Sequence, residues 1–213
     1  MKVGVLGSGI VAQTLAAGLA KYCHQVVIGS RSPEKLAEFA AKTPGVTAGN
    51  FADAAEFGEL IILAVKGSAA SEALGLAGVT NLADKTVIDT CNPIADGPPV
   101  NGVLQFYTGQ NDSLMEALQT EFPETNFVKA FNSVGAPRMI DPKFEGGKPT
   151  MFICGNNEAA KKVVSGILDQ FGWETADMGG VEAARAIEPL CRLWCIPGFL
   201  NNEWTHAFKL LKR

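Results

Sequence analysis

An apolar strand, a glycine turn and a helix open the chain in immediate succession, and this order constrains the fold more than any other feature. The turn reads Gly7-Ser8-Gly9-Ile10-Val11-Ala12, and a helical pattern follows it at 14–20. Gly7 permits a tight turn, Gly9 lets a pyrophosphate approach the backbone, and Ala12 lets the helix pack closely on the strand. The helix N-terminus adds amide donors and a positive dipole. The pattern predicts a dinucleotide contact at residues 7–11; a glycine turn in an unrelated α/β domain is the alternative.

The end of the next apolar run, residues 25–29, indicates which dinucleotide the site would take. An acidic residue placed here would hydrogen-bond the adenosine ribose of NAD, but Ser30, Arg31 and Ser32 stand in its place. Hydroxyls and a guanidinium can bind a ribose 2′-phosphate, so the sequence favours NADP(H). The candidate contacts are Ser30, Arg31, Ser32 and Lys35. Ser32 has an alternative role as the N-cap of a helix that begins at Pro33.

Further along, apolar strands alternate with helical patterns, which predicts an α/β fold of the Rossmann type with a doubly wound, mostly parallel sheet. We expect a dinucleotide-binding domain at 1–180 and a small C-terminal helical appendage at 181–213, interrupted by Pro189 and Pro197, that walls one side of the cleft. A Pro/Gly-rich connection at 92–109 leaves the carboxyl end of a strand, where ligands bind in such sheets. The remaining strands are expected near residues 46–49, 60–65, 86–90, 127–131, 151–154 and 174–177.

The loops that follow the inner strands supply further candidate contacts to the cofactor: Ala64, Val65, Lys66, Asn92, Pro93, Asn132, Val134 and Ala136. Lys66 suits either a phosphate or ribose contact or an exposed helix start. Cys91 has no base beside it in the sequence, so a small buried residue is favoured over a nucleophile. Lys129 fits a charged edge position. We expect no catalytic acid or base and no metal ligand.

The composition of the chain limits the classes of partner that we expect it to bind. The chain has 213 residues and a formal net charge of −4 without a basic cluster, which argues against nucleic acid. No apolar run reaches membrane-spanning length, and Met1 leads directly into the first strand, so a cytoplasmic location and a small-molecule substrate are expected. Five cysteines without CxxC spacing make disulfides and a structural zinc unexpected.

Five motifs follow one another along the chain: the glycine turn, Gly29-Ser30-Arg31, Lys129-Ala130-Phe131-Asn132, Ile153-Cys154-Gly155-Asn156 and Arg185-Ala186-Ile187-Glu188-Pro189. In this order and at similar spacing, they resemble the coenzyme F420-dependent NADP oxidoreductase family and the NADPH-binding domain of the six-transmembrane metalloreductases. The resemblance spans essentially the whole chain, and the Lys-Ala-Phe-Asn form is closer to the metalloreductases. It implies direct hydride transfer between NADPH and a flavin-like ring, which is the deazaflavin F420, FMN or FAD.

Other functions remain open at this point. The stretch 181–185 lacks the lysine that hydroxyacid dehydrogenases of similar architecture use, and the tail is shorter than the dimerisation domain of pyrroline carboxylate reductases. An NADPH-dependent reductase of a small carbonyl, imine or ferric substrate and a non-catalytic NADP(H)-binding module are the alternatives. The aromatic-rich tail, with Trp204 and Phe208, makes a homodimer a further expectation.

Overall fold

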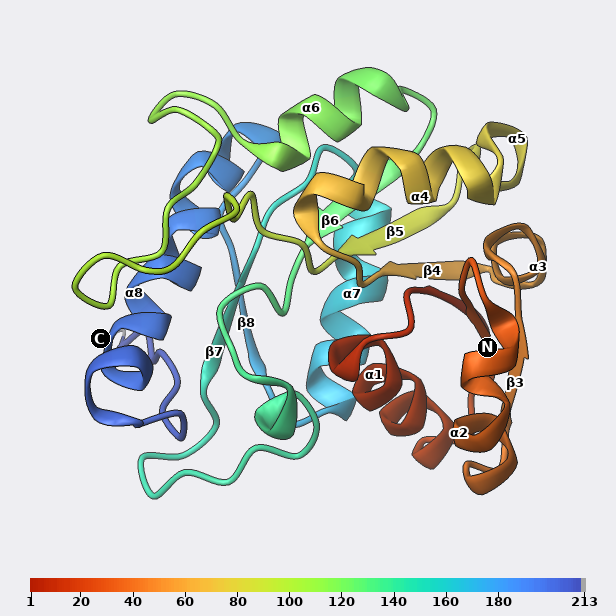
Figure 1. Ribbon diagram of the computed structural model, residues 1–213, viewed down its shortest axis with the longest axis horizontal. Coiled ribbons are helices and arrows are strands. Elements are labelled where there is room, and N and C mark those ends of the chain that lie inside the picture. Colours follow the sequence, from red (N-terminus) through yellow and green to blue (C-terminus); the bar gives the residue numbers. More distant parts are fainter. Residues whose placement is uncertain (212–213) are drawn as a thin grey trace.

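Six parallel strands form the central sheet in the order β3-β2-β1-β4-β5-β6, and the order in which the chain adds strands reverses between β1 and β4. Strands β4, β5 and β6 of this sheet are labelled in Figure 1. The computed structural model describes residues 1–211. The strands are β1 (Lys2–Leu6), β2 (Gln25–Gly29), β3 (Val46–Gly49), β4 (Leu60–Leu63), β5 (Thr86–Asp89) and β6 (Asn126–Lys129). This is the doubly wound Rossmann arrangement that the sequence predicts, and its ligands bind at the strands' carboxyl ends beside the reversal point.

Helices cover both faces of the sheet. They are α1 (Ile10–Lys21), α2 (Ala37–Lys42), α3 (Phe51–Phe57), α4 (Ala70–Ala77), α5 (Val79–Leu82), α6 (Leu114–Glu121), α7 (Glu158–Gln170) and α8 (Ala184–Asn201). Short 3-10 turns lie at Pro33–Leu36, Gly67–Ala69, Ala136–Arg138 and Val181–Ala183. One core cluster lies between the sheet and helices α1 and α7, and a second lies between the sheet and helices α3, α4 and α6.

Strand β4 shows why the inner strands read as continuous apolar runs. Leu60 and Ile62 join the core under α1 and α7, whereas Ile61 and Leu63 join the core under α3 and α4. All four side chains are buried because helices cover both sides of the strand. Burial on two faces removes the alternation of polar and apolar residues that half-exposed strands show.

The last two predicted strands exist, but they pair with each other outside the main sheet. Strands β7 (Thr150–Ile153) and β8 (Glu174–Asp177) form a separate parallel pair. One antiparallel bridge, between Lys129 and Cys154, joins this pair to the end of β6. Helix α7 crosses over between the two strands and packs its apolar face against the main sheet.

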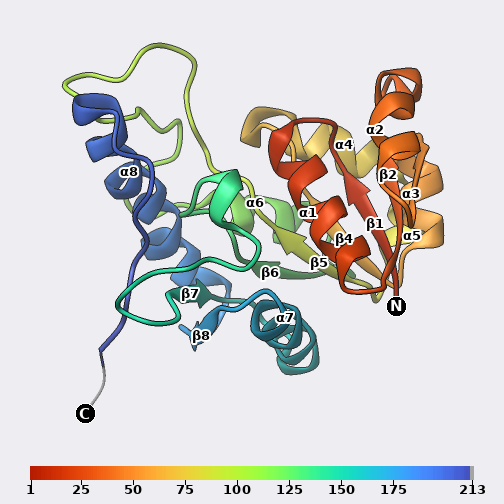
Figure 2. The same cartoon turned by 90° about the horizontal axis from the view of Figure 1, so that it is seen from below.

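The expectation of an interrupted helix that reaches the end of the chain was wrong. Helix α8 continues through Pro189 and Pro197 and ends at Asn201, where Asn202 adopts a left-handed φ of 56°. Residues 202–211 are not helical, and 212–213 lie outside the described part. This tail runs along β7, where the Phe208 carbonyl accepts the Thr150 N–H at 2.9 Å. Figure 2 shows α8 and the tail at the opposite end of the molecule from α2.

Within residues 1–211, no helix combines the length and apolarity that crossing a bilayer requires. All five cysteines are unbridged thiols. The boundary expected at residue 180 stays a prediction, although Val181, Ala184 and Ile187 share one core cluster with β4 and β5 side chains.

Gly7 and Gly9 offer a matched test of the glycine turn. A Cβ at Gly7 would lie 2.1 Å from the Ala64 carbonyl oxygen, at a φ of +144°, whereas a Cβ at Gly9 meets nothing within 4 Å. Gly7→Ala should therefore lower the free energy of unfolding by about 2–4 kcal/mol, and Gly9→Ala by no more than about 1 kcal/mol. Urea denaturation monitored by circular dichroism measures both; equal losses would show that close packing does not select Gly7.

Candidate functional site

A cleft of about 730 Å³ lies across the carboxyl ends of β1, β2, β4 and β5. Its volume falls in the range of small-molecule and cofactor sites. The lining residues are Gly7 to Val11, Ser30, Arg31, Phe51, Ala64 to Ala69, Glu72, Ala73, Thr90 to Asn92 and Ile94 to Gly97. The structure thus brings together eleven of the predicted contacts: Gly7, Ser8, Gly9, Ile10, Val11, Ser30, Arg31, Ala64, Val65, Lys66 and Asn92.

The glycine turn leaves an anion-sized space at the start of α1. Gly7 donates its N–H to the Gly29 carbonyl at 2.9 Å and so joins the turn to β2. Gly9 is the N-cap of α1, and no side chain caps this helix. The first turn of α1 also carries no acidic residue that would repel an anion. A Cβ at Gly9 would project into open space. Backbone amides and the helix dipole therefore suit a pyrophosphate here.

The loop after β2 supplies an exposed cation to the cleft wall. The Arg31 guanidinium lies 3.5 Å from the Glu72 carboxylate of α4, and both side chains are more than half exposed. Such a surface pair contributes about 0–1 kcal/mol, so Arg31 can exchange Glu72 for a phosphate. Ser30 is buried, and its Oγ accepts the Ser32 N–H at 3.0 Å, which shapes the turn. Ser32 makes no capping hydrogen bond to the turn at Pro33–Leu36.

Cys91 is a structural residue of the cleft wall. Its thiol donates to the Val65 carbonyl at 3.3 Å and lies almost entirely buried. Burial raises the pKa of this thiol, and the nearby Asp89 raises it further, so the thiolate does not form at neutral pH. Lys66, at the neighbouring loop, is exposed at the cleft.

Six predicted contacts lie outside the cleft lining: Ser32, Lys35, Pro93, Asn132, Val134 and Ala136. Val134 and Ala136 pack into the core under α1 and α7. Lys35 is exposed and Pro93 is buried. As cofactor contacts these six stay predictions.

Asn132 supports the cleft from behind. It is 4% exposed, and its Nδ2 donates to the Ile187 carbonyl of α8 at 2.9 Å. The backbone carbonyl of Asn132 accepts a hydrogen bond from Asn92 Nδ2 at 2.8 Å, so Asn132 holds Asn92 in the cleft wall. The preceding Phe131 adopts a φ of 61°, a strained conformation for a bulky residue, and this turns the chain at the end of β6.

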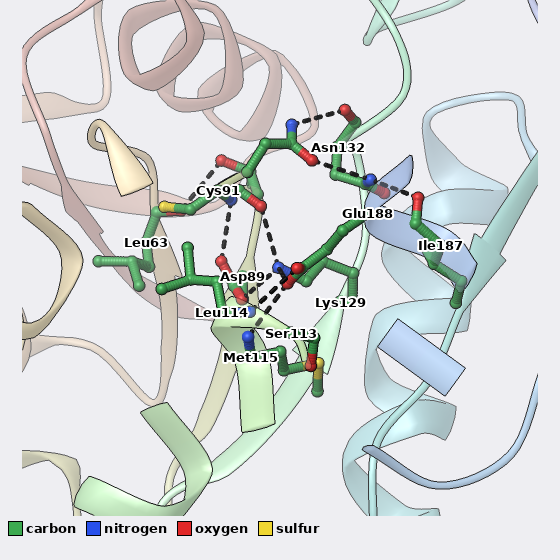
Figure 3. Close-up of polar contacts among 12 residues, drawn as sticks. Leu63, Asp89, Cys91, Ser113, Leu114, Met115, Lys129, Asn132, Ile187 and Glu188 are labelled. Atoms are coloured by element: carbon green, nitrogen blue, oxygen red, sulfur yellow. Dashed lines mark hydrogen bonds and ion pairs between the residues drawn. The ribbon is translucent and has the colours of Figure 1, made fainter. Parts of the chain in front are cut away.

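A buried ion cluster lies next to this wall, and sequence reasoning missed it (Figure 3). Lys129 Nζ pairs with Asp89 Oδ2 at 2.6 Å and with Glu188 Oε1 at 2.8 Å, and all three side chains are at most 1% exposed. Burial works to lower the pKa of Lys129, but the two carboxylates raise it above its usual value. We call Asp89, Lys129 and Glu188 the Lys129 cluster. Its members are 40 and 59 residues apart, so no local pattern indicates the pairing.

Backbone groups complete the cluster. Lys129 donates to the Cys91 carbonyl at 2.9 Å, and Asp89 Oδ1 accepts the Cys91 N–H at 2.9 Å. Glu188 accepts the N–H groups of Leu114 and Met115, each at 3.0 Å, at the N-terminus of α6. The cluster therefore joins β5, β6, α6 and α8 and fixes the Cys91 backbone.

The residues of the cleft that sequence reasoning missed come mainly from α4 and from the loop after β5. Glu72 faces Arg31 from α4, and no sequence motif marks it. Residues 94–97 belong to the Pro/Gly-rich connection, whose length and position did indicate a ligand-binding loop. Backbone bridges between Ile94 and Phe106 and between Val100 and Val103 order this loop.

Comparisons with known proteins give a consistent result. The family model described as NADP oxidoreductase, coenzyme F420-dependent, matches residues 2–93. The crystal structure of a putative F420-dependent NADP-reductase from Arthrobacter sp. FB24 superposes with a TM-score of 0.92 at 34% identity, with 100% of both chains covered. The F420-dependent NADP reductase of Methanocaldococcus jannaschii is 28% identical over 205 residues, which are 91% of this chain and 90% of that protein.

Metalloreductases are similar over part of their length. Metalloreductase STEAP3 of Rattus norvegicus is 34% identical over 203 residues, which cover 93% of this chain and 39% of that protein. The chain thus spans about two fifths of this curated relative. An imine reductase from Streptomyces aurantiacus, 16% identical with a TM-score of 0.67, shares the fold.

Removal of the buried ammonium tests the Lys129 cluster. Lys129→Met would leave two carboxylates without their cation, so we expect the free energy of unfolding to fall by about 3–5 kcal/mol in urea denaturation. Lys148→Met is the control, because Lys148 pairs with Asp169 at the surface at 3.1 Å and should lose less than about 1 kcal/mol. Similar losses in the two variants would contradict a structural role for the cluster.

Proposed function

Because the chain belongs to the family of coenzyme F420-dependent NADP oxidoreductases, we propose that it transfers hydride between NADPH and a deazaflavin or flavin bound in the cleft. The observation that carries the proposal is the full-length match to a putative F420-dependent NADP-reductase, together with a cleft at the Rossmann site. NADP(H) binding follows from the family, and the identity of the acceptor is the proposal.

The residues present fit NADP(H) along the whole cleft. Arg31, with Ser30 and Ser32 beside it, would hold the 2′-phosphate, as no carboxylate occupies the end of β2. The backbone at Ser8 and Gly9 would hold the pyrophosphate at the start of α1. Since these contacts occupy β2 and β1, the nicotinamide end would face β4 and β5, at Val65 and Cys91.

Small and neutral side chains at this inner end support hydride transfer between two flat rings. NADPH and F420 together supply the chemistry: a hydride leaves nicotinamide C4 for a ring carbon, and a proton from solvent completes the reduction. Ala64, Val65 and the neutral thiol of Cys91 would exclude water and orient the rings, while Asn132 holds Asn92 in place. Within the described structure, the side chains of Ala64, Val65 and Cys91 offer no effective proton donor of the kind that carbonyl reduction needs.

A flavin is the second candidate acceptor that we propose, because its ring system is flat like that of F420. Metalloreductase STEAP3 is similar to 93% of this chain. The shared stretch includes Lys129 and Asn132, which lie behind the cleft wall.

We also propose that the chain forms a homodimer. Three exposed apolar side chains on the second half of α8, Leu193, Phe199 and Leu200, support this proposal.

Arg31→Ala tests the choice of cofactor. Loss of charge-assisted hydrogen bonds to a 2′-phosphate should weaken NADPH binding by about 1.5–3 kcal/mol, or roughly tenfold to a hundredfold, with little effect on NADH. Titration calorimetry with both cofactors measures this difference. Glu72→Gln is the control: it keeps Arg31 and removes its competing partner, so NADPH should bind at least as tightly as to the parent. An equal loss of both cofactors in Arg31→Ala would refute the assignment.

Turnover with a panel of acceptors tests the reaction. We expect NADPH oxidation with F420 or a flavin, and none with a cyclic imine or a ferric chelate. With F420, whose acceptor atom is a carbon, one of the two C4-deuterated forms of NADPH should pass its label directly to the acceptor. Label found in solvent instead would show that a protein group takes part, and binding of NADPH without turnover would indicate a non-catalytic module.

A further inference from the structure

The Lys129 cluster holds more negative than positive charge. Two carboxylates share one ammonium, and the side chains of all three residues are at most 1% exposed. Burial raises the pKa of the neighbouring thiols, that of Cys154 to about 12, so Cys91 and Cys154 are neutral at pH 7. Burial is the main cause of a raised pKa of the Tyr107 hydroxyl, and the charge of Glu188 is the second cause. The three side chains of the cluster therefore carry a formal net charge of −1.

The two arginines of α8 that lie near the cluster in sequence, Arg185 and Arg192, have other contacts. Arg185 forms its ion pair with Glu116 at 2.5 Å, and Arg192 lies over the Phe106 ring at 5.0 Å from its centroid. The two N–H groups of α6 that bind Glu188 compensate the outer carboxylate in part. Asp89, on the inner side, has only the Cys91 N–H in addition to Lys129. The uncompensated charge thus lies toward the cleft.

One residue separates this charge from the cleft. Cys91 lines the cleft, and its backbone contacts the cluster through both its N–H and its carbonyl. Because Asp89 is the last residue of β5, its carboxylate lies under the end of the cleft that would receive the nicotinamide. Few water molecules can screen a charge in such a buried position, so its field reaches the wall.

We propose that the negative charge of the Lys129 cluster makes the cleft bind the nicotinamide cation of NADP⁺ in preference to the neutral ring of NADPH. The cluster would thereby favour release of hydride from the bound cofactor. The inference rests on the proposed function, because it needs the nicotinamide at the β4 and β5 end. The ring gains one positive charge when its hydride leaves, and a fixed negative charge nearby stabilises that product. Asp89 and Glu188 would raise the donor strength of the cofactor without touching it.

Asp89→Asn tests the proposal, because asparagine keeps the size of the side chain and an acceptor for the Cys91 N–H while removing the charge. Titration calorimetry gives separate Kd values for NADP⁺ and NADPH. We expect the Kd of NADP⁺ to rise about three- to tenfold and that of NADPH to change less than twofold. A tenfold rise in the ratio of the Kd of NADP⁺ to the Kd of NADPH raises the reduction potential of the bound two-electron couple by about 30 mV. A merely structural role would weaken both nucleotides equally.

Three further variants separate charge from structure. Glu188→Gln removes a charge on the far side of Lys129 and should shift the ratio in the same direction by a smaller factor. Asp89→Glu keeps the charge and should preserve the parent's ratio. Asp169→Asn is the control, because this exposed carboxylate on α7 lies on another part of the surface. If Asp89→Asn and Glu188→Gln both bind the two nucleotides with the parent's ratio of Kd values, the inference is overturned and the proposed function stands. If neither nucleotide binds the parent, the proposed function fails and the inference fails with it.

Discussion

The buried ammonium of Lys129 joins side chains from three elements that lie far apart in the sequence. Its two carboxylate partners come from the end of β5 and from α8, and one of them also binds the start of α6. Burial of three ionised groups costs several kcal/mol per ion, and only their mutual pairing and the surrounding amides offset that cost. The arrangement therefore tolerates little displacement, and it holds the backbone at Cys91 in one position. A cleft wall that must orient two flat rings benefits from such rigidity.

The cleft itself results from close backbone contacts rather than from large side chains. Gly7 lies against the Ala64 carbonyl, and Gly67 lies so close to Asn92 that a Cβ there would be 2.1 Å from its carbonyl oxygen. These contacts bring the loops after β1, β4 and β5 together at the point where the strand order reverses. Many of the lining side chains are small, which leaves space for a ligand. The charged side chains of the lining are Arg31, Lys66, Glu72 and Asp96, and the Lys129 cluster lies behind Cys91.

Local signals predicted the sheet and the glycine turn, because these depend on residues close together in sequence. The positions of all eight strands and the Rossmann class follow from apolar runs and from Gly7 and Gly9. Contacts between distant segments could not be predicted in this way. Lys129 reads as an edge residue, yet β5 and α8 bring carboxylates to it and its side chain is fully buried. The prolines of α8 predict breaks, but packing of Ile187 and Trp194 keeps the helix continuous.

The tail along β7 has a consequence for association between molecules. A two-stranded sheet has two edges with unpaired backbone groups, and such edges are templates for strand pairing with a second chain. The Phe208 carbonyl and the Leu210 N–H engage Thr150 on one of these edges, and the Lys209 ammonium binds the Lys148 carbonyl beside it. The segment that follows α8 thereby occupies the backbone N–H of Thr150 at the start of β7, which a strand of a second chain would otherwise need for pairing.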